Sequence, residues 1–115
     1  MPLVVGDSSD LASMREVAGS TRVVLTTVGP YVRHGANLVE ACVEAGTDCC
    51  DLTGEVAFIR AMIDAHHARA AELGVRIVSC CGFDSVPSDL GTLLLQTEAT
   101  KRLGAPCPEG RFSLR

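Results

Sequence analysis

The chain has 115 residues, of which 47% are hydrophobic and 21% are charged, and its formal net charge at pH 7 is −4. This composition is typical of one folded domain and excludes an intrinsically disordered chain, because disorder requires few apolar residues. The negative net charge disfavours nucleic acid as a partner, since contacts to a phosphate backbone need a basic face.

In chain order, short apolar runs alternate with amphipathic helical patterns. The apolar runs, each bounded by turn residues, predict strands over residues 2–5, 23–26, 47–52 and 75–79. Apolar residues at helical spacing predict helices over residues 11–18, 35–45, 55–73 and 87–97. Asp10 stands where a residue caps the first helix, and Gly46 and Gly74 stand where left-handed glycines end the next two.

This alternation with short connections predicts an α/β fold, a parallel sheet of about four strands with helices on its faces. We expect residues 1–100 to form this domain. Residues 101–115 show no helical or strand period, and we expect an irregular tail there. Parallel sheets bind ligands at the carboxyl ends of their strands. The loops of interest are therefore residues 6–10, 26–31, 51–55 and 80–88.

The N-terminal residues MPLVVGDSSD lack the basic region of a signal peptide. No apolar run approaches the ~20 residues of a membrane span, so we expect a cytoplasmic protein. The six cysteines include no C-x-x-C pair, and a zinc site is not expected. In the cytoplasm we expect most of these cysteines to be reduced and buried, where they pack as small apolar residues.

The loop after the second predicted strand carries two hydroxyls and a glycine, in the order Thr26, Thr27, Val28, Gly29, Pro30. Glycine allows a flat ring or a phosphate to approach the backbone closely, which indicates a ligand loop. An ordinary turn between a strand and a helix explains the same residues equally well.

Three carboxylates also follow predicted strands. Asp7 stands where an acidic residue can hold a ribose or an adenine amine, although such a residue more often caps a helix or is simply solvated. Asp51 and Glu55 flank Thr53-Gly54, where two carboxylates can perform acid–base chemistry. The plainer interpretation, which we favour, is that they stabilise the start of a helix electrostatically.

Two further features bear on chemistry. A nucleophilic Cys81 would need a nearby histidine such as His66 or His67, and the sequence does not show whether either is close. A dinucleotide fold usually carries G-x-G-x-x-G after its first strand, where backbone amides meet the pyrophosphate. The chain contains no such pattern.

Three motifs, TTVGPYVRHG, TDCCDLTGE and CCGFDSVPSDLG, occur in this order between Pro2 and Leu95. In sequence and spacing they resemble the saccharopine dehydrogenase-like oxidoreductases, and most of all the actinobacterial trans-acting enoyl reductases. The segment GFDSVPSD is the most specific part of this resemblance.

The resemblance implies a partial NAD(P)-binding Rossmann-like domain. It places Asp7, Thr27, Val28, Gly29, Pro30 and Asp51 at the cofactor, and it names no catalytic residue. In the family, a glycine-rich loop lies before the equivalent of Pro2 and a second domain follows downstream. The sequence contains neither the glycine-rich loop nor the second domain, so we expect this chain to be inactive by itself.

The complete family enzyme would transfer a hydride from NADPH or NADH to an enoyl group of a polyketide-type lipid precursor. The resemblance accordingly implies a nicotinamide cofactor, an acyl substrate, and either a homo-oligomer or a polyketide synthase as partner.

Two other hypotheses stand beside this one. The chain could be a non-catalytic remnant or binding module that pairs through an exposed sheet edge at residues 2–5. More remotely, it could be a thiol enzyme that uses Cys81.

Overall fold

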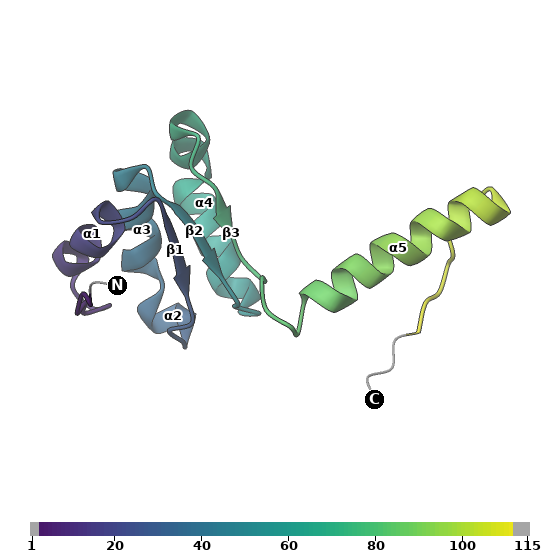
Figure 1. Cartoon of the computed structure of the whole chain (residues 1–115), viewed down its shortest axis with the longest axis horizontal. Coiled ribbons are helices and arrows are strands. Elements are labelled where there is room, and N and C mark those ends of the chain that lie inside the picture. The colour runs from purple at the N-terminus through teal and green to yellow at the C-terminus, as the bar shows by residue number, and fades with distance from the viewer. Residues whose placement is uncertain (1–2, 112–115) are drawn as a thin grey trace. The chain divides into compact units, whose positions relative to one another are not determined.

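The computed structural model describes residues 3–111 and divides into two compact units, Met1–Cys81 and Gly82–Arg115. The first unit contains a parallel sheet with strand order β1-β2-β3 (Figure 1). The strands are β1 (Val23–Thr26), β2 (Asp48–Asp51) and β3 (Ile77–Val78). The predicted α/β class and the parallel sheet are therefore confirmed.

Within residues 3–111, four helices belong to the first unit and a fifth to the second, as labelled in Figure 1. They are α1 (Leu11–Gly19), α2 (Tyr31–His34), α3 (Ala36–Ala45), α4 (Val56–Leu73) and α5 (Val86–Leu103). The predicted caps are confirmed, because the Asp10 side chain accepts a hydrogen bond from the backbone N–H of Ala12 at the start of α1. Gly46 and Gly74 adopt left-handed φ angles of 72° and 69° that end α3 and α4.

The core lies on one face of the sheet. Val24, Cys49 and Ile77 are register partners on neighbouring strands, and all three pack against the buried side chains of the helices. The buried set comprises Met14, Ala18, Leu38, Ala41 and Cys42 in one cluster, Tyr31, Val39 and Phe58 in a second, and Val43, Ala70 and Val75 in a third. Helix α3 contributes to every cluster and is the centre of the unit.

The opposite face of the sheet is open, which differs from the prediction of helices on both faces. Leu25, Cys50 and Val78 are the register partners on this face, and Leu25 is 70% exposed. Because side chains alternate along a strand, every second residue of the three strands points to this uncovered side.

The strand predicted over residues 2–5 does not form within the described residues. Pro2 lies outside the described residues, and Leu3, Val4 and Val5 have no regular structure, with Leu3 92% exposed. A strand needs a neighbour to accept its backbone hydrogen bonds, and this segment pairs with none of the described strands, although the outer side of β1 is unpaired. The described residues therefore form three strands rather than four.

The second unit consists of α5 and the segment that follows it. Pro87 lies in the first turn, as predicted, but the helix continues past residue 97 to Leu103, where Gly104 ends it. Ion pairs from Glu98 to Lys101 and Arg102 stabilise these extra turns. The Gln96 side chain exchanges two hydrogen bonds with the backbone of Cys107, which fixes the following segment against the helix.

Among residues 3–111, no helix combines the length and the apolar character needed to cross a bilayer.

Candidate functional site

The loops that follow the three strands meet at one edge of the sheet. Thr26 and Asp51 are register partners at the ends of β1 and β2, and Ser79 directly follows β3. Two of the predicted ligand loops, at residues 26–31 and 51–55, therefore lie side by side, with the beginning of the third next to them. This edge is the candidate site.

The loop from Thr26 to Tyr31 is held at both ends. The backbone N–H of Val28 donates to Thr26 Oγ1 at 3.2 Å, and the Tyr31 hydroxyl donates to the Thr26 carbonyl at 3.0 Å. The Gly29–Pro30 peptide bond is cis. Residues 27–30 are all exposed, and within the described residues no hydrogen bond uses Thr27 or Gly29. The polar groups of these two residues are thus available to a ligand.

A glycine supports the same loop from behind. A Cβ atom at Gly35 would lie 2.6 Å from Phe58 Cζ and 2.9 Å from the Tyr31 carbonyl oxygen. The absence of a side chain lets Phe58 approach and pack against the Tyr31 ring, with 5.9 Å between the ring centroids. The loop therefore rests on a close-packed aromatic pair.

Asp51 is only 3% exposed, and its carboxylate faces the protein. Oδ1 accepts the backbone N–H of Thr53 and Oδ2 accepts the Ser79 hydroxyl, each at 3.0 Å. The Asp51 carbonyl also accepts the backbone N–H of Cys81 at 2.8 Å. Asp51 therefore connects the end of β2 to the end of β3. The two residues that it binds there, Ser79 and Cys81, flank Cys80, whose φ of 62° is left-handed.

Glu55 reaches across to the neighbouring loop. Its Oε1 accepts the backbone N–H of Tyr31 at 2.8 Å, and its Oε2 accepts that of Val32 at 2.9 Å. Both carboxylates of the second loop are thus engaged within the chain. Glu55 binds amides at the start of a helix, as in the plainer sequence interpretation, whereas Asp51 binds Thr53 and Ser79 outside any helix. No local pattern in the amino-acid sequence indicates that Glu55 binds α2 rather than α4.

Asp7 begins an exposed turn that precedes α1. Its Oδ1 accepts the backbone N–H of Ser9 at 2.8 Å, and its own N–H donates to Ser13 Oγ at 2.9 Å. The turn is attached to α3, because Asn37 Nδ2 donates to the Ser8 carbonyl at 3.0 Å. Asp7 therefore stabilises a helix entry while remaining open to solvent.

A cleft of about 350 Å³ joins the first two predicted loops. Gly6 and Ser8 line one side, and Thr26, Thr27 and Val28 line the other. The structure thus brings the Gly6–Ser8 turn next to the β1 loop. Asp51, at the end of the neighbouring strand β2, is not among the residues that line this cleft.

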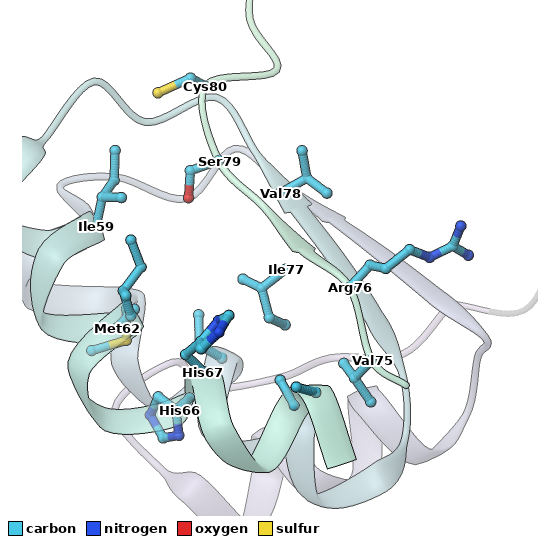
Figure 2. A pocket seen from close by; sticks show the side chains of 14 residues that line it. Ile59, Met62, His66, His67, Val75, Arg76, Ile77, Val78, Ser79 and Cys80 are labelled. Carbon is cyan, nitrogen blue, oxygen red and sulfur yellow. The ribbon is translucent and has the colours of Figure 1, made fainter. Parts of the chain in front are cut away.

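A second cavity of about 580 Å³ runs between α4 and β3, and the sequence did not predict it (Figure 2). Ile59, Met62, His66 and His67 of α4 line it together with Ile77 of β3, and in Figure 2 the His67 ring lies nearer to Ile77 than the His66 ring does. Ile63 of the same helix is 48% exposed, since no described strand lies beyond β3 to cover this side of α4.

The cysteines differ from the expectation that most are buried. All six are free, but only Cys42 and Cys49 are buried, and Cys81 is exposed. The hydrogen bond with Cys42, together with burial, raises the pKa of the Cys49 thiol.

Cys81 lacks the features of an activated nucleophile. Loss of solvation and the nearby Cys50 and Asp51 raise the pKa of its thiol, and its Sγ donates to the Val78 carbonyl at 3.4 Å. A thiol enzyme requires the pKa to move in the opposite direction, since the thiolate is the nucleophile.

The chain is similar in sequence to part of several mycobacterial proteins. It is 54% identical over 100 residues to a trans-acting enoyl reductase of Mycobacterium ulcerans (strain Agy99), covering 87% of this chain and 24% of the relative. It is 51% identical over 107 residues to the trans-acting enoyl reductase of Mycobacterium leprae (strain TN), covering 92% of this chain and 26% of the relative. No protein-family model matches the chain.

Among solved structures, the chain resembles apo histidine-tagged saccharopine dehydrogenase (L-Glu forming) from Saccharomyces cerevisiae. The TM-score is 0.69 at 19% identity, over 83% of this chain and 20% of that one, which shows a shared fold. The resemblance indicated by the three motifs is therefore confirmed. The chain spans about a quarter of the length of the curated relatives it matches.

Proposed function

We propose that this chain forms the nicotinamide side of the cofactor site in an NAD(P)-dependent enoyl reductase. The observation that carries the proposal is the β1 loop, where the polar groups of Thr27 and Gly29 are free at the carboxyl edge of a parallel sheet. The names of the curated relatives support the reaction class.

The exposed residues of this loop fit one end of a nicotinamide cofactor. The three nearest atoms to a Cβ added at Gly29, apart from its chain neighbours, belong to Tyr31 and lie at 3.6 Å or more, so the glycine leaves room for a flat ring. Within the chain, no G-x-G-x-x-G segment offers amides to a pyrophosphate. The residues present therefore suit the ribose and nicotinamide, while the phosphates need amides from elsewhere.

In the proposed site, Thr27, Val28, Gly29 and Pro30 contact the cofactor, and Asp7 lies on its adenine side. Asp51 belongs to the set as the residue that shapes the edge, because both of its carboxylate oxygens bind within the chain. The cofactor, when bound, supplies the hydride that reduces the carbon–carbon double bond. The loop orients it and excludes water from one of its faces.

The substrate in this proposal is an enoyl group of a polyketide-type lipid precursor, carried by a polyketide synthase in the cytoplasm. A homo-oligomer or the synthase itself would be the protein partner. The segments that hold the pyrophosphate and the acyl chain would complete the site.

The alternative function, a binding module that pairs through its sheet, has one observation in its favour. The unpaired outer strand of the described sheet is β1 rather than residues 2–5. Its side chains Val23 and Leu25 are exposed on the open face of the sheet. Such an apolar surface suits association with another chain.

A chimera tests the proposal most directly. The matched segment of the Mycobacterium ulcerans enzyme is replaced by the corresponding residues of this chain, and NADPH oxidation is followed with an enoyl thioester. We expect the chimera to reduce the thioester and to bind NADPH. A chimera that folds, as judged by circular dichroism, but binds no NADPH at millimolar concentration would contradict the cofactor role and favour the binding module.

A further inference from the structure

We infer that Glu55 is a positioning residue for the β1 loop, and that it acts across the sheet edge from the end of the neighbouring strand. The inference rests on the proposed function for its effect on a cofactor, but its structural part stands independently. Its basis is a continuous set of hydrogen bonds that joins all three strand ends.

The first link is the pair of bonds from Glu55 to α2. The two carboxylate oxygens accept the consecutive backbone N–H groups of Tyr31 and Val32, at 2.8 and 2.9 Å. The first N–H groups of a helix lack partners within the helix, and a carboxylate there is favoured by their partial positive charge. Pro30 precedes α2 and offers no side-chain cap, so Glu55, which lies 23 residues after Val32, fills that role.

The second link is Tyr31, which is anchored at both ends of the residue. Glu55 holds its backbone N–H, and its hydroxyl donates to the Thr26 carbonyl at 3.0 Å. The side chain is 5% exposed and packs on Phe58. The loop that contains the exposed residues 27–30 is consequently held in position at both of its ends, Thr26 and Tyr31.

The third link holds Glu55 itself. Its backbone N–H donates to Thr53 Oγ1 at 3.0 Å, and Thr53 is only 2% exposed. The Thr53 N–H donates to Asp51 Oδ1, and Asp51 Oδ2 accepts the Ser79 hydroxyl. One chain of hydrogen bonds therefore runs from the end of β3 to the loop after β1.

This arrangement gives the loop a fixed shape before any ligand arrives. Ordering a loop on binding lowers affinity, because the free energy of ordering is subtracted from the contacts that the loop makes. A carboxylate at position 55 removes that cost at Thr27–Pro30 without touching the ligand.

The structural part is tested by nuclear magnetic resonance on the 115-residue chain. Glu55→Gln leaves one acceptor for two amides, and Glu55→Asp keeps the charge but shortens the reach. We expect hydrogen exchange at Tyr31 and Val32 to become at least about tenfold faster in Glu55→Gln. The amide signals of residues 27–29 should shift, with smaller changes in Glu55→Asp.

The matched control is Glu44→Gln, which removes an exposed carboxylate that pairs with Arg15 on the surface. We expect it to leave exchange at Tyr31 and Val32 unchanged. Loop signals that stay in place in both Glu55 variants would overturn the inference. If Glu55→Gln does not fold, Glu55→Asp alone decides the question.

The functional part uses the chimera described above. We expect Glu55→Gln to raise the KM for NADPH about tenfold with a much smaller change in kcat, whereas a residue needed only for folding would lower the active fraction and leave KM unchanged. Equal NADPH affinity with and without Glu55 would refute the positioning role and leave the proposed function intact. A chimera that never binds NADPH would refute the proposed function, while hydrogen exchange still decides the role of Glu55.

Discussion

Asp48 and Arg76 join the amino-terminal ends of β2 and β3. The candidate site lies at the other, carboxyl-terminal end of these strands. Asp48 Oδ1 accepts the backbone N–H of Arg76 at 2.9 Å, and Oδ2 accepts its side-chain Nε at 3.0 Å. These bonds, from the guanidinium first and the backbone second, lower the pKa of the Asp48 carboxyl. The two ends of the sheet are thus held by different carboxylates, Asp48 at one and Asp51 at the other.

The lowered pKa of Asp48 predicts how stability depends on pH. A carboxyl whose pKa is lower in the folded state contributes stability above its unfolded pKa of about 3.9, and this contribution disappears as pH falls through the folded value. We expect Asp48→Asn to be less stable than the wild type at pH 7, with the difference shrinking below about pH 4. Urea unfolding at several pH values measures this, and a difference that is independent of pH would contradict the assignment.

The close contact behind the β1 loop predicts a large difference between two glycines. In Gly35→Ala the new methyl group meets Phe58 and the Tyr31 carbonyl, and we expect a loss of about 1–3 kcal/mol in the free energy of unfolding. Gly19→Ala is the matched control, because no atom beyond its chain neighbours and the backbone of its own helix lies within 4 Å of the added Cβ. That variant should be neutral or slightly stabilising in urea unfolding. Equal losses in both variants would mean that Phe58 does not pack at Gly35.

Because one face of the sheet is open, we expect substitutions at two adjacent residues of β1 to change the free energy of unfolding by different amounts. Val24 packs on the helices, and Val24→Ser should lower the free energy of unfolding by about 1–2 kcal/mol. Leu25 lies on the open face, and Leu25→Ser should change it by less than about 0.5 kcal/mol. Chemical unfolding followed by circular dichroism compares the two. A Leu25→Ser variant as unstable as Val24→Ser would show that another chain covers this face in solution, as the binding-module alternative requires.

The cysteines predict a distinct pattern of alkylation. Cys81 is exposed and should react with iodoacetamide in the folded protein, slowly at pH 7 and faster as pH rises towards its raised pKa. Cys42 and Cys49 are buried and should react only after unfolding. Mass spectrometry of native and denatured samples separates these cases. In the chimera, Cys81→Ala should keep full reductase activity, and a loss of activity would revive the thiol hypothesis.

Local signals in the sequence determined the three strands of the first unit, its helices α1, α3 and α4, and their order, but not the short helix α2. The cap at Asp10 and the left-handed glycines at 46 and 74 act within one helical turn, so their positions are legible without the fold. The alternation of strands and helices also implied the parallel sheet, because a crossover helix returns the chain in the same direction. From these rules the strand ends at Thr26 and Asp51 could be placed at one edge in advance.

Only the tertiary structure decided which groups meet at that edge. Glu55 binds amides of α2, and Asp51 binds Ser79, 28 residues away, so neither pairing leaves a periodic trace in the sequence. The apolar run at residues 3–5 looked like a strand, but a strand exists only where a neighbour accepts its hydrogen bonds. Helix α4 contributes Phe58 and Ala70 to the core, while other residues of its apolar side line an open groove beside β3. Hydrophobic pattern therefore determined which residues prefer burial, whereas the packing of distant segments determined which of them achieve it.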